Sequence, residues 1–234
     1  MSSLPPPQVA EQSALRDLPV TFHAKPVYQV CKRMLDVVVS GVFLVLLTPV
    51  WLVLAILIKL DSTGPVFFVH PAVGRSGSEF VLYKFRSMLP ASHIPDHIAH
   101  VESNLRRGES TCSDRMGPIF KTALTDQSRI TRIGRFLRCT SLDELPQVWN
   151  VFRGDMSLVG PRPALPYEAR LYDEWQKQRF MVKPGMTGWY QVTARNRVPI
   201  QEMIRLDLEY VRNQSMALDL KILLRTPVAM FSGM

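Results

Sequence analysis

The chain has 234 residues, of which 47% are hydrophobic, so it is large enough for one domain or a small pair with a sizeable core. Its formal net charge of +8 favours an anionic partner, and nucleic acid, anionic lipid and phosphorylated substrates all fit that charge. Cys31, Cys112 and Cys139 are odd in number and lack Cys-x-x-Cys spacing, which argues against a disulfide framework or a zinc site and favours reduced thiols facing the cytosol.

Residues 1–30 are predicted to form a disordered N-terminal tail. Pro5, Pro6 and Pro7 are followed by polar and small residues that show no clear apolar period. The segment is also too polar for a secretory signal peptide.

Residues 31–60 carry the strongest structural signal, a stretch of 22 residues without a formal charge from Val37 to Ile58. A helix of this length can cross a hydrocarbon core about 30 Å thick. Pro49 near its middle predicts a kink or break, where Thr48 can bond a carbonyl that the proline frees. Cations lie on both flanks and give no clean crossing direction. We therefore favour a re-entrant helix-break-helix hairpin, broken at Thr48 and Pro49, over a single full span.

Residues 61–234 are predicted to form a small cytoplasmic domain that begins with a β-hairpin. Val66–Val69 and Phe80–Phe85 are the expected strands, and the turn between them contains Gly74 and Gly77. A short hairpin of this kind is a minor part of a mainly helical fold.

A polar insert of about residues 90–129 follows the hairpin. His93, His97 and His100 are at helical spacing there, which places their rings on one face of a helix. Because no acidic residues stand at clear ligand spacing, a solvated insert is favoured over a metal site.

The rest of the domain is expected to be helical, which gives the α+β, mainly helical fold class. Ile130–Leu137 interleaves basic and apolar residues and suits an amphipathic helix at an interface, or a solvated basic face. Tyr167–Arg179 and Ile200–Asn213 have a roughly helical period, and Leu218–Met230 is a more apolar helix that can rest on a bilayer.

The segment Ser141-Leu142-Asp143-Glu144 places two adjacent carboxylates close to Arg138. A carboxylate can attack phosphorus or bind a hard cation, and nearby guanidinium groups can neutralise charge on phosphoryl oxygens. Ser141 and Glu144 also match a capping box, in which both side chains serve only a helix start. These residues alone leave both interpretations open.

Basic and polar residues in rigid loops are further candidates for phosphate binding. Arg162 lies between two prolines, which lowers the entropy lost when its planar fork binds a phosphate. A loop-stapling salt bridge is the alternative role for Arg162. Pro184–Trp189 resembles a tight turn in which glycine lets the backbone approach a ligand and Trp189 is available for stacking.

Five strings resemble the bacterial sugar transferases, the monotopic phosphoglycosyl transferases. They are KRMLD from Lys32, KFRSM from Lys84, SLDELPQVWNV from Ser141, GDMSLVGPRP from Gly154 and PGMTGW from Pro184. The likeness runs from about Cys31 to the terminus. It favours catalysis over capping for Asp143 and Glu144.

The resemblance implies an enzyme that moves a sugar 1-phosphate from a nucleotide diphosphate sugar, usually a UDP-sugar, to polyprenyl (undecaprenyl) phosphate. Asp143 matches the nucleophile, which would form a sugar-phosphoryl-aspartate and release UMP. Glu144 matches the second acid, and the two carboxylates are the expected Mg²⁺ ligands. The expected phosphate ligands are Lys84, Arg86, Arg138 and Arg162, and the nucleotide-side or sugar-side candidates are Gln191, Arg195 and Trp189.

The resemblance also implies a place on the cytoplasmic face of the bacterial inner membrane, at the first membrane step of exopolysaccharide, capsule or O-antigen-type glycan synthesis. A homodimer and contacts with downstream glycosyltransferases are further expectations, and nucleic acid is not an expected partner. The family's long forms carry additional spans and a further domain, whereas this sequence resembles a compact catalytic unit.

Two departures from the family pattern limit what can be carried over. His70 and Ala72 stand where the family commonly has glutamine and arginine, and Ser128 stands where a proline is common. The alternative function is a membrane-anchored protein without turnover, either a binding protein whose basic face recruits nucleic acid or anionic lipid, or an inactive scaffold, which the missing arginine at Ala72 suggests. The donor sugar is not encoded by any of the strings.

Overall fold

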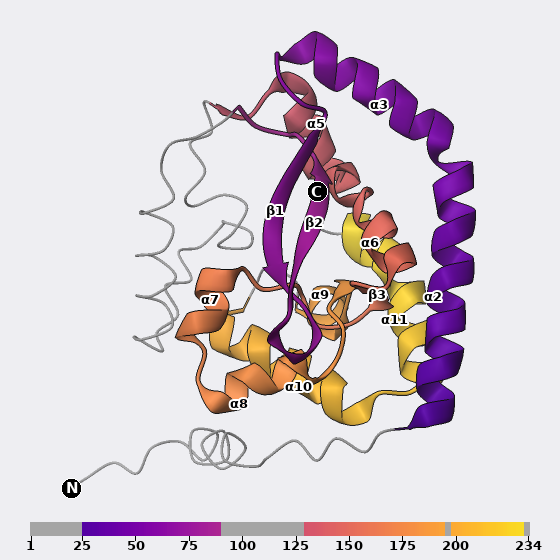
Figure 1. Ribbon diagram of the computed structural model, residues 1–234, viewed down its shortest axis with the longest axis vertical. Coiled ribbons are helices and arrows are strands. Elements are labelled where there is room, and N and C mark those ends of the chain that lie inside the picture. The colour runs from indigo at the N-terminus through magenta and orange to yellow at the C-terminus, as the bar shows by residue number, and fades with distance from the viewer. Residues whose placement is uncertain (1–24, 90–128, 195–197, 232–234) are drawn as a thin grey trace, which may run out of the picture.

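The computed structural model describes residues 25–89, 129–194 and 198–231, and the expected tail and polar insert lie outside the described residues, apart from their last residues. The described chain is mainly helical, with two small two-stranded sheets, which confirms the α+β class. Figure 1 shows α2 along one side of the molecule, α3 across its top and the β1–β2 hairpin in the centre.

Helices α2 (Pro26–Leu46) and α3 (Thr48–Asp61) form the expected broken pair, and α2 starts before the expected boundary at residue 31. No helix of the described chain is by itself long and apolar enough to cross a membrane, but this pair passes that test jointly and is bent by 58°. Pro49 lies in the first turn of α3, where its missing N–H costs nothing. Thr48 Oγ1 donates to Leu44 O at 2.7 Å, as expected at the break.

The expected hairpin is present with longer strands, β1 (Phe67–Val73) and β2 (Glu79–Phe85), joined through a short 3-10 turn, η1 (Arg75–Gly77). The strands are antiparallel, with His70 opposite Leu82 and Phe68 opposite Lys84. Because side chains alternate between the two faces of a strand, His70 and Lys84 lie on the same face of the hairpin.

The expected turn at Pro184–Trp189 is wrong, because Gly185–Thr187 is strand β4 and pairs in parallel with β3 (Ser157–Val159). The glycine serves the packing of two backbones. A Cβ on Gly185 would lie 2.1 Å from Gly160 N, so no side chain fits there.

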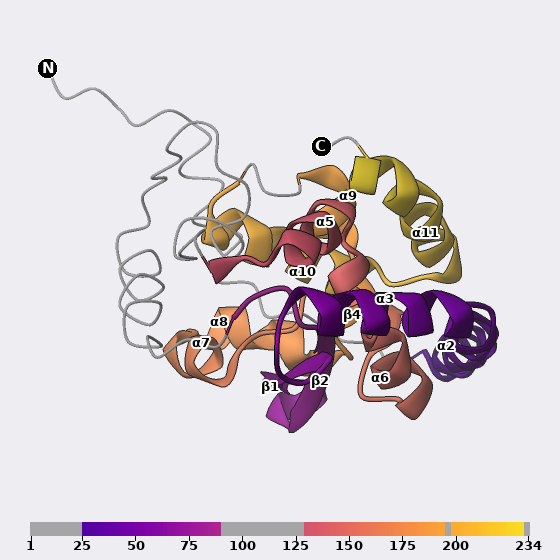
Figure 2. The same ribbon diagram turned by 90° about the horizontal axis from the view of Figure 1, so that it is seen from above.

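The other predicted helices are present with one correction, and two short helices, α6 (Gln147–Arg153) and α9 (Trp189–Thr193), were not predicted. The single helical segment expected over Tyr167–Arg179 is divided into α7 (Pro166–Leu171), α8 (Glu174–Lys177) and a 3-10 turn, η4 (Gln178–Met181). The others are α5 (Arg132–Thr140), η3 (Leu142–Glu144), α6 (Gln147–Arg153), α9 (Trp189–Thr193), α10 (Ile200–Asn213) and α11 (Met216–Phe231). Seen from above in Figure 2, α11 lies at the side of the molecule and α3 passes over its middle.

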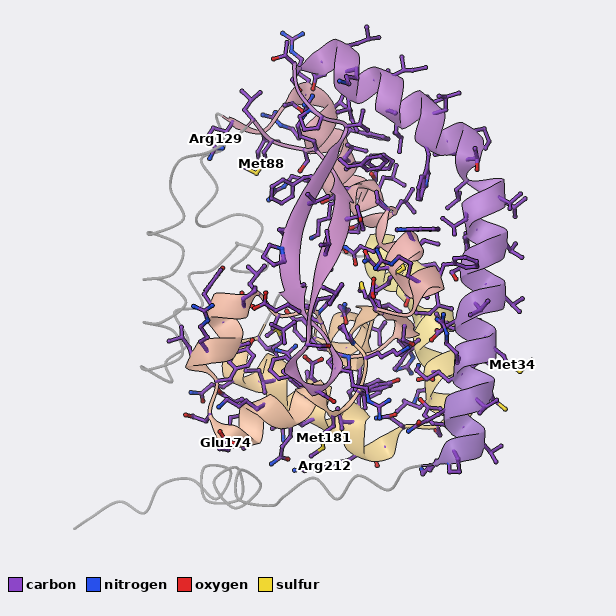
Figure 3. The ribbon with its side chains drawn as sticks, in the orientation of Figure 1. Met34, Met88, Arg129, Glu174, Met181 and Arg212 are labelled. Carbon is purple, nitrogen blue, oxygen red and sulfur yellow. The ribbon has the colours of Figure 1, made fainter. Side chains whose placement is uncertain are left out.

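Helix α2 is fastened to the rest of the chain by the charged residues of the KRMLD string. Lys32 Nζ lies 2.8 Å from Asp219 Oδ2, and Arg33 donates to two carbonyl oxygens near the end of α6. Asp36 Oδ1 accepts from Ser157 Oγ at 3.1 Å and from Leu158 N at 2.9 Å. One face of α2 is thereby held on the domain, whereas Met34 points away from it (Figure 3).

Candidate active site

The two carboxylates follow a sharp change of chain direction at the end of α5. Thr131 caps the start of that helix, where its Oγ1 accepts from Gly134 N at 2.9 Å. Ser141 ends it in the left-handed conformation, with φ of 57°, and η3 begins at once. The Ser141 side chain makes no capping hydrogen bond to η3, so the capping box does not form and that interpretation is wrong.

Asp143 is buried, with 5% of its surface exposed, between two leucines that anchor η3. Leu142 and Leu145 pack against a core cluster of Leu54, Ile58, Phe85 and Leu137. These four residues come from α3, β2 and α5. The hydrophobic packing on both sides of the aspartate holds its carboxylate in one place.

Two cations act directly on the carboxylates. Lys84 Nζ, at the end of β2, lies 3.4 Å from Glu144 Oε1, and both side chains are partly exposed. Burial lowers the pKa of Arg138, whereas the negative charge of Asp143 raises it. Burial has the larger effect, so the pKa of Arg138 is lowered. Arg138 Nη1 also contacts Met88 Sδ at 3.1 Å, which orients the guanidinium from the strand side. Figure 3 shows Met88 beside Arg129, where the end of β2 meets the approach to α5.

Arg162 lies after β3 in a loop whose backbone is fixed by a buried ion pair. Arg179 Nη2 donates to Arg162 O at 2.8 Å and to Asp207 Oδ2 at 2.5 Å. Asp207 in turn receives a hydrogen bond from the Arg162 main chain, and both partners of the pair are 1% exposed. Sequence reasoning missed Arg179 and Asp207, because they lie in separate helical segments without a shared motif.

His70 is the functional candidate that sequence reasoning did not place. Burial is the main cause that lowers its pKa, and the positive charges of Lys84 and Arg162 lower it further, whereas its hydrogen bond to Pro71 O raises it. The imidazole therefore lies within the electrostatic reach of both cations. The expected first strand ends at Val69, before His70, so only the observed pairing register puts His70 and Lys84 on one face.

The other expected site residues have different surroundings. Arg86 is buried against the end of α3, where its Nη2 donates to Ser62 O at 2.6 Å. Gln191 Nε2 donates to Met186 O at 3.4 Å, and Lys221 Nζ lies 5.5 Å from the centre of the Trp189 ring. Arg195 lies outside the described residues. The substrate roles assigned to these four residues stay predictions.

The donor atoms of the carboxylate pair fit a magnesium ion. No cluster of three or more histidine, cysteine or acidic side chains that could hold a metal occurs within residues 25–89, 129–194 and 198–231. Mg²⁺, however, is commonly held by one or two carboxylates together with substrate phosphates. Asp143 and Glu144 supply two adjacent carboxylates of this kind.

Comparisons with known proteins match the chain to one protein family. The family model described as bacterial sugar transferase matches residues 27–233. The UDP-galactose-lipid carrier transferase of Erwinia amylovora is 41% identical over 83% of this chain and 39% of its own length. The UDP-glucose:undecaprenyl-phosphate glucose-1-phosphate transferase of Xanthomonas campestris pv. campestris is 37% identical over 86% of this chain and 39% of its own length.

A shorter relative, the exopolysaccharide production protein ExoY of Sinorhizobium fredii, is 35% identical over 86% of both chains. The chain thus spans about two fifths of the two longer relatives and most of the shorter one. Because the family model covers nearly all of the described residues, the chain belongs to the bacterial sugar transferase family.

Proposed function

We propose that the protein transfers a sugar 1-phosphate from a UDP-sugar to polyprenyl (undecaprenyl) phosphate, as the first membrane step of a bacterial surface or secreted glycan. The observation that carries this proposal is the buried aspartate Asp143, whose charge acts on Arg138. The next residue, Glu144, forms an ion pair with Lys84. The names of the relatives support the class of reaction, because two name a sugar-transferring enzyme that acts on a lipid carrier or undecaprenyl phosphate.

In the proposed mechanism, an Asp143 oxygen attacks the phosphorus that bears the sugar. The bond from that phosphorus to the bridging oxygen breaks, UMP leaves with that oxygen, and a sugar-phosphoryl-aspartate forms. An oxygen of polyprenyl phosphate then attacks the same phosphorus and frees the Asp143 carboxylate. Neither step requires a general acid, because the leaving groups are a phosphate and a carboxylate.

The surrounding cations neutralise the charge that develops on the phosphoryl oxygens. Arg138 and Lys84 approach from α5 and β2, and Arg162 is held in place by its clamped main chain. Asp143 and Glu144 would hold Mg²⁺. When bound, the ion supplies further charge neutralisation at the diphosphate oxygens.

The bent pair α2 and α3 suits a re-entrant hairpin in the cytoplasmic membrane, with the rest of the domain on the cytoplasmic face. Large apolar side chains are exposed on both helices, and further ones, Phe136, Trp149 and Phe152, are exposed on α5 and α6. A shallow insertion of this kind fits an acceptor whose tail stays in lipid while its phosphate reaches the surface.

The test is UMP release by the purified protein in detergent with Mg²⁺ and polyprenyl phosphate, across a panel of UDP-sugars. Asp143→Asn keeps the shape of the side chain but is a poor nucleophile, so turnover should fall by about three orders of magnitude or more. Retained membrane association of this variant is the control for folding. Residual turnover above about one percent would contradict the nucleophile assignment, and binding without turnover would favour a scaffold.

A further inference from the structure

The C-terminal end of α3 is bound by a buried arginine from the end of β2. Arg86 Nη2 donates to Ser62 O at 2.6 Å, to Ser62 Oγ at 2.9 Å and to Ile58 O at 3.3 Å. Ile58 O lies in the last turn of α3 and also accepts from Ser62 N, whereas Ser62 O lies just beyond the hydrogen bonds of the helix. A cation there also complements the negative end of the helix dipole.

The same end of α3 supplies a carboxylate to the start of α5. Asp61 Oδ2 accepts from Ile133 N at 2.9 Å, in the first turn of that helix. Helix α5 ends at Ser141 and leads directly to Asp143. Asp61 is the last residue of α3, so this hydrogen bond connects the end of the hairpin to the helix that leads to the nucleophile.

Arg86 is buried, whereas the side chain of Lys84 is partly exposed to solvent. Only 5% of Arg86 is exposed, and a Cβ on Gly64 would lie 2.3 Å from its Nη1, so the chain leaving α3 closes over the guanidinium. Gly64 has φ of +120°, which favours glycine as well. Nε and Nη1 have no hydrogen-bond partner among the described residues, so direct contact with a substrate phosphate is the competing role for Arg86.

Hydrophobic packing connects the same elements beneath these polar contacts. Leu54 and Ile58 of α3 lie in one cluster with Leu137 of α5, and Leu142 and Leu145 of the carboxylate segment pack against it. The hairpin and the nucleophile thus share one core. A shift of α3 would be transmitted to the carboxylates, because a close-packed core does not deform smoothly.

We infer that Arg86 and Asp61 are positioning residues that fix the exit of the membrane hairpin relative to Asp143, and thereby present the acceptor phosphate to the covalent intermediate. This inference rests on the proposed function. The UDP-sugar arrives from water and does not depend on where the bilayer lies. The polyprenyl phosphate is held in the bilayer, so its phosphate reaches Asp143 only at one depth of the hairpin.

The experiment separates the two half-reactions in Arg86→Gln and in Asp61→Ala. The first half-reaction is followed as exchange of labelled UMP into UDP-sugar without acceptor, and the complete reaction is followed as kcat/KM for polyprenyl phosphate. We expect kcat/KM for the acceptor to fall by about tenfold or more, because small misplacements of reacting groups have effects of this size. The exchange rate should change by less than about twofold.

Two further variants serve as controls. Arg86→Lys retains a charged donor that can reach Ser62 O, so it should restore part of the acceptor kcat/KM. Arg170→Gln removes the same charge from an exposed position on α7 and should leave both half-reactions unchanged.

Three results would overturn the inference. A raised KM for UDP-sugar and a slowed exchange in Arg86→Gln would make Arg86 a direct phosphate ligand. An equal fall of both half-reactions together with the melting temperature, in both variants, would leave Arg86 and Asp61 as merely structural. Failure of the unaltered protein to exchange UMP with any UDP-sugar would refute the proposed function itself, which the variants alone cannot do.

Discussion

His70 illustrates how a single residue acquires its properties from its neighbours. The side chain is on the hairpin face that carries Lys84, and Arg162 approaches from the loop after β3. Burial and the two positive charges disfavour a third positive charge at this place. The ring is therefore held in the neutral form to a lower pH than an unperturbed histidine.

We predict that His70 makes the protein less stable in acid. Because its pKa is lowered on folding, the unfolded chain binds more protons as the pH falls below about 6.5, and the free energy of unfolding falls with it. His70→Gln should lose less stability between about pH 7.5 and 5.5, measured by urea unfolding in detergent. Equal losses in the two proteins would contradict the prediction. His70 is the only histidine among the described residues.

At the scale of elements, the break between α2 and α3 determines the course of the apolar segment. Leu47 alone separates the two helices, and in a continuous helix the ring of Pro49 would clash with the carbonyl four residues before it. The hydroxyl of Thr48 donates to Leu44 O in the last turn of α2. The bend is therefore built into the backbone and does not need the lipid to impose it.

We predict that tags at both termini of the unaltered protein are on the cytoplasmic side. Pro49→Ala removes the proline ring and favours one continuous helix, whose 22 uncharged residues would span about 33 Å. The N-terminal tag of this variant should then become accessible from the other side, as measured by labelling in intact cells. Pro227→Ala, which alters a proline inside α11, is the matched control and should not change the labelling. External labelling of either terminus in the unaltered protein would replace the hairpin with a full span.

At the scale of the whole molecule, contacts of α2 attach the broken helix pair to the rest of the domain. Asp36 Oδ1 accepts hydrogen bonds from two donors of β3, Ser157 Oγ and Leu158 N, and Asp36 is 3% exposed. A buried N–H that loses its acceptor has no water to replace it. This contact therefore links the orientation of α2 to the sheet that leads to Arg162.

We predict that Asp36→Ala lowers the free energy of unfolding by about 2–4 kcal/mol, because two buried donors lose their acceptor. Asp36→Asn retains the acceptor oxygen and should cost about half as much or less. Urea unfolding in detergent gives both values. Equal losses for the two variants would show that the charge of Asp36, and not its acceptor oxygen, provides the stabilisation.

The sequence by itself determined the elements whose cause is local. A long uncharged run with a central proline has few alternatives to a broken apolar helix, and the bounds of α10 were predicted to the residue. The alternating strands around Gly74 and Gly77 likewise predicted the hairpin. The strings shared with the bacterial sugar transferases predicted the family, which the family model confirms, and motif recognition needs no knowledge of spatial contacts.

Only the tertiary structure decided the roles that depend on partners distant in sequence. Gly185–Thr187 is a strand and not part of a turn because β3 lies beside it, and Ser141 is no cap because α5 ends there in a left-handed residue. Lys84 and Arg86 are two positions apart, yet the first faces Glu144 and the second is enclosed against α3. Local sequence does not contain this difference, because the energy of a charged side chain depends on which buried donors and acceptors the fold brings to it.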